Sequence, residues 1–272
     1  FEKVFHECGR IYGMCLQRYA KTPKKYVYLP YKLSHIDMKL AIISAMSAEH
    51  EQICHLLTDA RTVRVGRHSL VEGRIGEHEV VLMQCGIGKV NAAIGATELI
   101  AHCSPDALIS TGCAGVIDTR LAVMDVVVSS ELVYHDVWCG EGNAYGQVQG
   151  LPKRFSAASQ LVAVARAMAA EAADAGVEAT RIHCGLICTG DKFITDREEL
   201  AAIKTAFPDG LAVDMESAAL AQTCHLLGVP FVSFRIISDT PGVDAHWAQY
   251  ENFWDTMAHR SFGVTKRFLE SV

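Results

Sequence analysis

Short apolar runs alternate with longer amphipathic or Ala-rich stretches along most of the chain, and this alternation predicts an α/β fold. The apolar runs predict strands over residues 39–45, 80–84, 106–112, 123–129, 184–191, 211–213 and 231–237, and a further strand ending near residue 73 that forms a hairpin with 80–84. The stretches between them predict helices from residue 46 onward and over residues 89–100, 156–176, 197–206, 217–228 and 247–269. No repeat or linker divides the chain after Met38, so we expect one domain over residues 38–272.

Two acidic residues stand at predicted junctions near the end of the chain. Glu216 follows the short strand 211–213, and Asp239 follows Ser238 at the end of the wholly apolar run 231–237. Because ligands of α/β sheets bind beyond the carboxyl ends of strands, Glu216 and Asp239 are candidates for one shared crevice. The alternative is that both are solvated acids at the ends of elements.

A third acid occupies the same kind of position early in the chain. Glu49 lies in the first turn of the helix that follows the strand 39–45, with Ser47 as the expected N-cap. The helix dipole alone favours a carboxylate there. The functional interpretation is an acid at a strand end, for which Glu51 is the competing candidate.

Two loops rich in small residues also follow predicted strands, at residues 85–89 and 113–115. The first lacks the glycine spacing of a phosphate-binding loop, so its glycines indicate close backbone approach to a bound group or a tight turn. The adjacent pair His135 and Asp136 lacks a third ligand at a suitable spacing, which favours a structural hydrogen-bonding role. We therefore expect no metal and no cofactor.

Composition narrows the class of protein. The net charge of −6 argues against nucleic acid or an anionic membrane as a partner, and no apolar run is long enough to span a bilayer. The 10 cysteines include no CxxC pair, and several lie within apolar runs. Buried thiols in a reducing compartment, the cytoplasm, explain them better than disulfides or zinc.

Residues 1–37 differ from the rest of the chain, because they are basic and aromatic and have the Lys-rich stretch 21–26. They lack the apolar segment of a signal peptide, and Met38 stands directly before the first predicted strand. We interpret them as an extension or arm outside the domain. A transit peptide is the less favoured alternative, because serine is scarce and acidic residues are present.

Seven motifs, in order, resemble the 5′-methylthioadenosine/S-adenosylhomocysteine nucleosidases of the purine nucleoside phosphorylase superfamily. They are IISAMSAE (42–49), CGIGKVNAA (85–93), STGCAG (110–115), YHD (134–136), GDKFI (190–194), VDMESAA (213–219) and RIISD (235–239). Together they cover nearly all of residues 38–272. The resemblance implies a single α/β domain with a mixed, twisted central β-sheet flanked by helices.

The resemblance also implies roles for the three acids. Asp239 matches the acid that protonates N7 of the purine, Glu49 the carboxylate that activates water, and Glu216 the carboxylate that grips the ribose hydroxyls. Cleaving an N-ribosidic bond builds positive charge on the sugar and negative charge on the leaving base, so an acid at the base and carboxylates at the sugar suit the reaction.

The substrate-binding residues that the resemblance implies surround these acids. Met215 accompanies Glu216 at the ribose, Ser238 belongs to the turn that holds adenine, and Phe193 and Ile194 bracket the base. The same set includes Cys113, Met46 and Arg235. This sequence has Cys113 where the family commonly has Ser, and Asp214 where it commonly has Glu.

The expected reaction is hydrolysis of 5′-methylthioadenosine and S-adenosylhomocysteine in methionine salvage, by a cytoplasmic homodimer. A phosphate-dependent phosphorylase is one alternative, but it needs cationic phosphate ligands, and the loops 44–47 and 110–115 contain no Arg or Lys. Arg235 is expected to be structural or linked to Glu216. The other alternative is a nucleoside-binding domain without catalysis. The preferred 5′ substituent stays open, and 6-amino-6-deoxyfutalosine is a further candidate.

Overall fold

The computed structural model describes residues 37–174, 180–244, 246–260 and 262–272. The strands are β1 (Lys39–Ser44), β2 (Thr58–Val65), β3 (His68–Ile75), β4 (His78–Gln84), β5 (Ala107–Val116), β6 (Val126–Tyr134), β7 (Phe155–Ser156), β8 (Ile182–Thr189), β9 (Gly210–Asp214) and β10 (Phe231–Asp239). The helices are α2 (Ser47–Cys54), α3 (Lys89–Cys103), α4 (Ser159–Asp174), α5 (Arg197–Ala206), α6 (Ser217–Leu227), α7 (His246–Arg260) and α8 (Phe262–Ser271). The predicted extension 1–37 lies outside the described residues except for Asp37.

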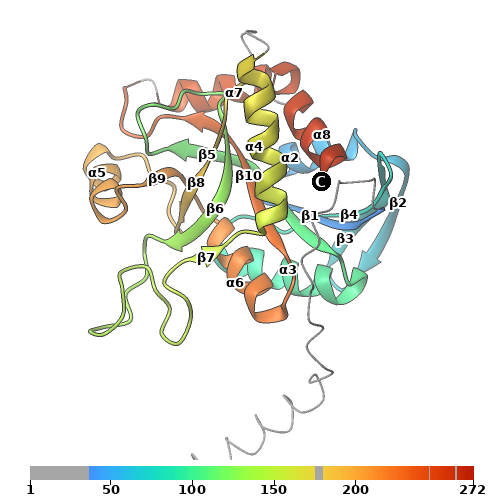
Figure 1. Ribbon diagram of the computed structural model, residues 1–272, viewed down its shortest axis with the longest axis horizontal. Coiled ribbons are helices and arrows are strands. Elements are labelled where there is room, and N and C mark those ends of the chain that lie inside the picture. Colours follow the sequence, from blue (N-terminus) through green and yellow to red (C-terminus); the bar gives the residue numbers. More distant parts are fainter. Residues whose placement is uncertain (1–36, 175–179, 245, 261) are drawn as a thin grey trace, which may run out of the picture. The chain divides into compact units, whose positions relative to one another are not determined.

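All the described strands belong to one mixed sheet (Figure 1). Its order is β10-β6-β8-β9-β5-β1-β4-β3-β2, with β7 beside β6 and an additional pairing of β10 with β5. The last pairing closes β5, β9, β8, β6 and β10 into a ring. The pair β10–β5 is parallel, whereas β10–β6 and β5–β9 are antiparallel. The predicted mixed sheet is therefore confirmed, and its partial closure is a feature that sequence patterning did not indicate.

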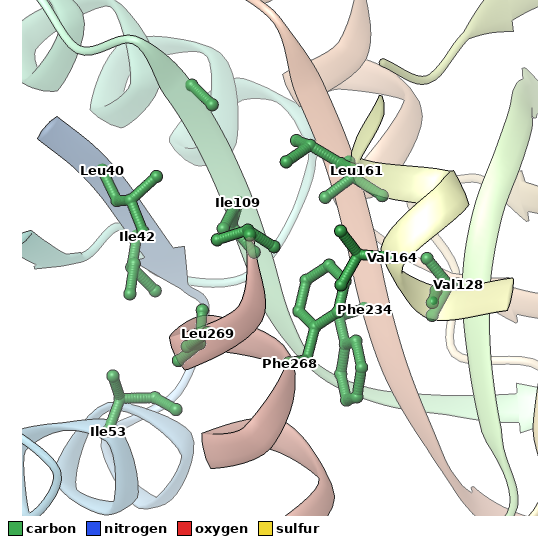
Figure 2. Close-up of a cluster of buried hydrophobic side chains, with 14 of the residues drawn as sticks. Leu40, Ile42, Ile53, Ile109, Val128, Leu161, Val164, Phe234, Phe268 and Leu269 are labelled. Atoms are coloured by element: carbon green, nitrogen blue, oxygen red, sulfur yellow. The ribbon is translucent and has the colours of Figure 1, made fainter. Parts of the chain in front are cut away.

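Helices cover both faces of this sheet. On one face, α2, α4 and α8 bury Ile53, Leu161 and Phe268 against strand residues such as Leu40 and Phe234 (Figure 2). On the other face, residues of α3 and α6 pack against a second set of strand residues. Figure 1 shows α4 lying along β6 and β8. Because both faces are covered, β10 is buried at all nine of its positions, as its apolar sequence predicts.

The element boundaries follow local capping chemistry. At α5, the Asp196 side chain accepts from the backbone N–H groups of Glu198 and Glu199. At the other end of α6, Gly228 adopts a left-handed conformation with φ of 71°, which suits glycine at a helix C-terminus. At α2, the N-cap is Met46, one residue before the Ser47 predicted for that position.

Several predicted boundaries were wrong. Residues 113–115 are the end of β5 rather than a loop, and the helix predicted over 156–176 begins at Ser159. The helix predicted over 247–269 consists of α7 and α8. Of its predicted aromatic stripe, Phe253 is buried in the core, while the side chains of Trp254, Met257 and Phe262 lie outside the described residues. None of the described helices is both long and apolar enough to cross a bilayer.

Candidate active site

One cavity opens at the carboxyl ends of β1, β5, β9 and β10. It is lined by Ala45, Met46, Glu49, Ile87, Cys113, Ala114, Gly115, Lys192, Phe193, Ile194, Val213, Asp214, Met215, Glu216, Ser238, Asp239, Pro241 and Tyr250. The three acids predicted from sequence therefore meet at one place, although Glu49 and Asp239 lie near opposite ends of the described chain. The strand ends bring them together, as expected for a ligand site of an α/β sheet.

Glu49 is buried and held by backbone donors. Its Oε2 accepts from the N–H groups of Ala45 and Met46, each at 3.0 Å, and its Oε1 accepts from the N–H of Cys113 at 3.0 Å. The first two bonds cap α2, and the third ties α2 to β5. Glu51, the competing candidate, is exposed and does not line the cavity.

At position 113, the contact with Glu49 does not depend on which side chain is present. The donor to Glu49 is the backbone N–H of Cys113, which serine would supply equally well. Glycine at position 112 is required by the same packing, because a Cβ there would lie 2.6 Å from Glu49 Oε1 and 2.8 Å from an Arg235 nitrogen. Close approach of the Glu49 carboxylate to β5 thus depends on Gly112.

Glu216 stands at the N-cap position of α6 with its side chain at the cavity. Its Oε1 accepts from the N–H of Gly88 at 2.9 Å. Gly88 has a φ of 96°, which favours glycine, and the backbone of this loop comes close to the Glu216 carboxylate. The predicted close approach to a bound group stays a prediction. Burial, aided by the negative charge of Asp214, raises the pKa of Glu216 to about 7.

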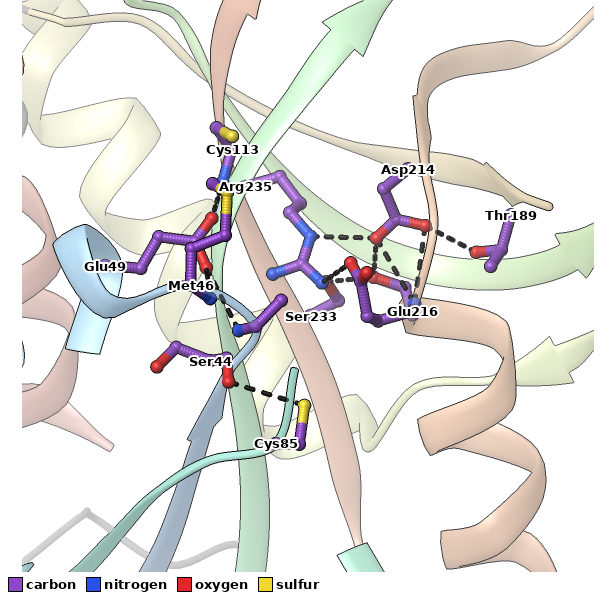
Figure 3. Close-up of polar contacts among 12 residues, drawn as sticks. Ser44, Met46, Glu49, Cys85, Cys113, Thr189, Asp214, Glu216, Ser233 and Arg235 are labelled. Atoms are coloured by element: carbon purple, nitrogen blue, oxygen red, sulfur yellow. Dashed lines mark hydrogen bonds and ion pairs between the residues drawn. The ribbon is translucent and has the colours of Figure 1, made fainter. Parts of the chain in front are cut away.

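A buried ion pair lies behind Glu216 (Figure 3). Arg235 Nε donates to Asp214 Oδ2 at 2.8 Å, and a second Arg235 nitrogen is 3.9 Å from Glu216 Oε2. The hydroxyl groups of Thr189 and Ser217 also donate hydrogen bonds to the Asp214 carboxylate. Arg235, predicted as a substrate-binding residue, is not among the described residues that line the cavity. Its position fits the sequence expectation of a structural residue linked to Glu216.

Asp239 ends β10 and is 1% exposed. The Ser238 hydroxyl donates to its Oδ1, and Nε2 of His246 lies 2.9 Å from its Oδ2. Burial raises the pKa of Asp239, while the bonds from Ser238 and His246 oppose that shift. A carboxyl group with a raised pKa in a cavity wall is suited to carry and release a proton near neutral pH.

Aromatic and aliphatic side chains form the rest of the wall. Phe193 is 39% exposed, and its ring lies 5.4 Å from that of Tyr250, while Ile194 is buried beside it. The Tyr250 hydroxyl approaches the sulfur of Met46 at 3.7 Å. Together with Met215, these side chains give the cavity a largely apolar lining that suits a planar base and an apolar substituent.

The structure thus brings nine of the ten residues predicted for the site to one cavity, all except Arg235. Sequence analysis missed His246 and Tyr250. The seven-residue separation of His246 from Asp239 was the available signal, but the intervening loop had no pattern that placed the two together. Within the described part of the chain, no group of three or more His, Cys, Asp or Glu side chains could hold a metal ion.

His135 and Asp136, considered as a catalytic or metal-binding pair, do not line this cavity. Asp136 instead accepts from Lys89 Nζ at 2.7 and 2.9 Å and from the N–H of Asp191 at 2.8 Å. Lys89 N–H donates in turn to Asp191 Oδ1 at 2.7 Å. These bonds fix the loop that carries Gly88, so the structural role holds for Asp136, whereas Nε2 of the His135 side chain has no hydrogen-bond partner among the described residues.

Comparison with known proteins gives a consistent result. The family model of the phosphorylase superfamily matches residues 39–270. The 5′-methylthioadenosine/S-adenosylhomocysteine nucleosidase of Actinobacillus succinogenes is 41% identical over 225 residues, which cover 82% of this chain and 95% of the relative.

Solved structures of similar proteins share the fold. The S-adenosylhomocysteine nucleosidase of Streptococcus pyogenes, in complex with 5-methylthiotubericidin, superposes with a TM-score of 0.80 at 38% identity, covering 87% of this chain and 98% of the other. The 5′-methylthioadenosine/S-adenosylhomocysteine nucleosidase of Colwellia psychrerythraea, in complex with adenine, has a TM-score of 0.80 at 36% identity, covering 88% and 97%.

Proposed function

Because this chain belongs to the phosphorylase superfamily and, within it, to the 5′-methylthioadenosine/S-adenosylhomocysteine nucleosidases, we propose that it hydrolyses the N-ribosidic bond of these two nucleosides and releases adenine. The observation that carries the proposal is the shared cavity of Glu49, Glu216 and Asp239. As the bond breaks, negative charge develops on the base and positive charge on the sugar. An acid at the base neutralises the first, and two carboxylates at the sugar stabilise the second.

In the proposed mechanism, Asp239 donates its proton to N7 of adenine, so that the base leaves as a neutral molecule. Its raised pKa keeps this proton available. The proton transfer contributes about 10²–10⁴-fold to the rate, as general acid catalysis typically does. Ser238 orients the carboxyl group through its hydroxyl.

At the sugar, Glu49 takes a proton from the attacking water while its backbone donors hold the carboxylate in place. Glu216 accepts from the ribose hydroxyls and, when ionised, stabilises the positive charge of the ribosyl group. Met215 lies under the sugar, and Phe193 and Ile194 bracket the base. Cys113 lines the cavity and donates its backbone N–H to Glu49.

Water is favoured over phosphate as the nucleophile by the charges at the cavity. Lys192 is the only Lys or Arg among the described residues of the lining, and its ammonium group is 2.7 Å from Glu199. Arg235 lies behind the cavity and is paired with Asp214. A phosphorylase needs cationic donors for its phosphate, and these two are engaged elsewhere.

We further propose a homodimer that acts in methionine salvage in the cytoplasm, without nucleic acid as a partner. Three large apolar side chains are exposed at and just before the start of α3, at Ile87, Val90 and Ile94. Ile87 also lines the cavity, so a second subunit on this surface would border the substrate. The described cysteines carry free thiols, which suits a reducing compartment.

The test is release of adenine from 5′-methylthioadenosine with and without phosphate. We expect adenine and methylthioribose in both cases. Strict dependence on phosphate, with a ribose 1-phosphate as product, would identify a phosphorylase, and tight nucleoside binding without turnover would identify a binding protein. Parallel assays with S-adenosylhomocysteine and 6-amino-6-deoxyfutalosine rank the 5′ substituents.

A further inference from the structure

Among the described residues outside the cavity lining, His246 is the one whose side chain comes closest to Asp239, the proposed acid. Its Nε2 lies 2.9 Å from Asp239 Oδ2, and the two residues are 4% and 1% exposed. His246 itself does not line the cavity. Any influence on the reaction must therefore pass through the cavity residues that it contacts, chiefly Asp239 through the hydrogen bond and Phe193 through ring packing.

Local structure holds the imidazole in this position. His246 is the first residue of α7, and its backbone N–H donates to the carbonyl of Val243 at 3.0 Å. The N–H of Thr240, directly after Asp239, donates to the Gln249 side chain at 2.9 Å. These bonds fix the start of α7 to the end of β10.

Aromatic rings enclose the imidazole. The Phe193 ring centroid lies 5.5 Å from that of His246, and the Trp247 centroid lies 5.7 Å from it. Phe193 separates His246 from the cavity on one side, since Phe193 is part of the lining. In such an apolar setting a hydrogen bond to an ionised carboxylate is strong, because water does not compete for it.

We propose that His246 is a positioning residue for Asp239: it orients the carboxyl group and stabilises the carboxylate that forms when adenine takes its proton. With the proton on Nε2, the imidazole donates to Oδ2 while the Ser238 hydroxyl donates to Oδ1. Asp239 is then a stronger acid toward the base than burial alone would allow. The proposal rests on the nucleosidase activity proposed above.

The surrounding charges decide the expected direction of a pH effect. Burial raises the pKa of Asp239, and Ser238 and His246 lower it. From β5, Cys113 lines the same cavity as this carboxyl group, and burial raises the pKa of its thiol. Glu49 and Glu216 line the same cavity, Arg235 lies on β10 with its charge directed at Asp214 and Glu216, and Tyr250 lies on α7. Removing His246 removes a stabiliser of the ionised form, so the pKa of Asp239 rises further.

The experiment compares two substrates in wild type and His246→Leu. One is 5′-methylthioadenosine, and the other is the 5-methylthioriboside of 4-nitrophenol, whose leaving group departs without a proton. For methylthioadenosine we expect kcat to fall about 10–100-fold, part of what general acid catalysis supplies. The alkaline limb of the pH profile of kcat/KM should move to higher pH. Turnover of the nitrophenyl riboside should change less than about threefold, which also shows that the variant folds.

Two further variants complete the design. His246→Gln retains an amide donor and should recover part of the methylthioadenosine activity. His78→Leu removes another buried histidine, at the amino end of β4 and remote from the cavity, and should leave both the pH profile and the substrate ratio as in wild type.

Equal losses on both substrates in His246→Leu, or an unchanged alkaline limb, would overturn the role of His246. Unchanged methylthioadenosine turnover would do the same. Failure of the proposed function has a different signature, since wild type itself would then release no adenine, and the role of His246 would fall with it.

Discussion

Of the three carboxylates given a role in the reaction, Glu216 and Asp239 have raised pKa values, and these have separate causes. Glu216 is buried beside the negative Asp214, whereas for Asp239 burial acts against two hydrogen-bond donors. Glu49 is instead surrounded by three backbone N–H donors. The environments therefore fit three distinct tasks, a proton donor at Asp239, a ribose ligand at Glu216 and an acceptor of the water proton at Glu49.

Substitution of the acid and the base tests these tasks. Asp239→Asn should lower kcat for methylthioadenosine by about 10²–10⁴-fold, because the amide cannot donate the proton in the same way. Glu49→Gln should stop hydrolysis and still bind the substrate, as measured by isothermal titration calorimetry. Near-wild-type turnover of either variant, with its fold shown by circular dichroism, contradicts the role given to that residue.

The raised pKa of Glu216 also predicts how stability depends on pH. The pKa of the Glu216 carboxyl group is about 7 in the folded protein and 4.5 in the unfolded chain. Between pH 4.5 and pH 7, the folded protein therefore binds more protons at this group than the unfolded chain does. The contribution of this group to the free energy of unfolding therefore falls as pH rises from about 4.5 to 7. The side chain of Glu216→Gln stays neutral. As the pH rises from 5 to 8, the free energy of unfolding of this variant should therefore increase relative to that of wild type by on the order of 1–3 kcal/mol.

Urea unfolding at the two pH values measures this gain, and Glu51→Gln on the exposed side of α2 is the matched control. A difference between Glu216→Gln and wild type that is the same at pH 5 and pH 8 contradicts the assigned pKa.

At the scale of elements, the buried pair Asp214–Arg235 joins β9 to β10. The two side chains are 1% and 3% exposed, and Thr189 and Ser217 complete the hydrogen bonding of the carboxylate. The pair connects the two strands at whose carboxyl ends Glu216 and Asp239 stand. Its removal should therefore affect the fold and the site together.

Asp214→Ala leaves the Arg235 charge buried without its closest partner, and breaking a buried ion pair in this way typically costs about 3–5 kcal/mol. We expect a lower melting temperature and loss of adenine release, measured by thermal unfolding and by activity below the transition. Asp214→Glu keeps the charge and should cost less. An Asp214→Ala variant as stable as wild type would show that the pair is dispensable.

The sequence predicts elements well where one pattern dominates. The apolar run 231–237 and the Ala-rich segment that ends at Gly228 gave β10 and α6. By contrast, β2 went unpredicted, because six of its eight residues are exposed and its sequence TDARTVRV has no buried face. The pairing of β10 with β5 and the His246–Asp239 contact depend on tertiary packing, which local patterns do not encode.

At the scale of the whole molecule, the cavity lies beside an apolar surface that the described residues leave exposed. Ile87, Val90 and Ile94 are 51%, 68% and 40% exposed. Val90 and Ile94, four residues apart, lie on one side of α3, and Ile87 stands two residues before that helix begins. In the proposed homodimer this surface is buried by the second subunit.

Val90→Asp places a charge in the centre of that surface, which should convert the dimer to a monomer in sedimentation-velocity experiments. The KM for methylthioadenosine should rise, because Ile87 links the surface to the cavity. Glu51→Gln, on the exposed side of α2, serves as the control. A Val90→Asp protein with an unchanged sedimentation coefficient would place any interface elsewhere.

The convergence of three carboxylates on one glycosidic bond is tested most directly by a crystal structure of Asp239→Asn with bound 5′-methylthioadenosine. We predict residue 239 within hydrogen-bonding distance of N7, Glu216 on the ribose hydroxyls, and a water between Glu49 and C1′. A nucleoside bound away from this cavity, or bound in it with either glutamate turned away from the sugar, would contradict the account.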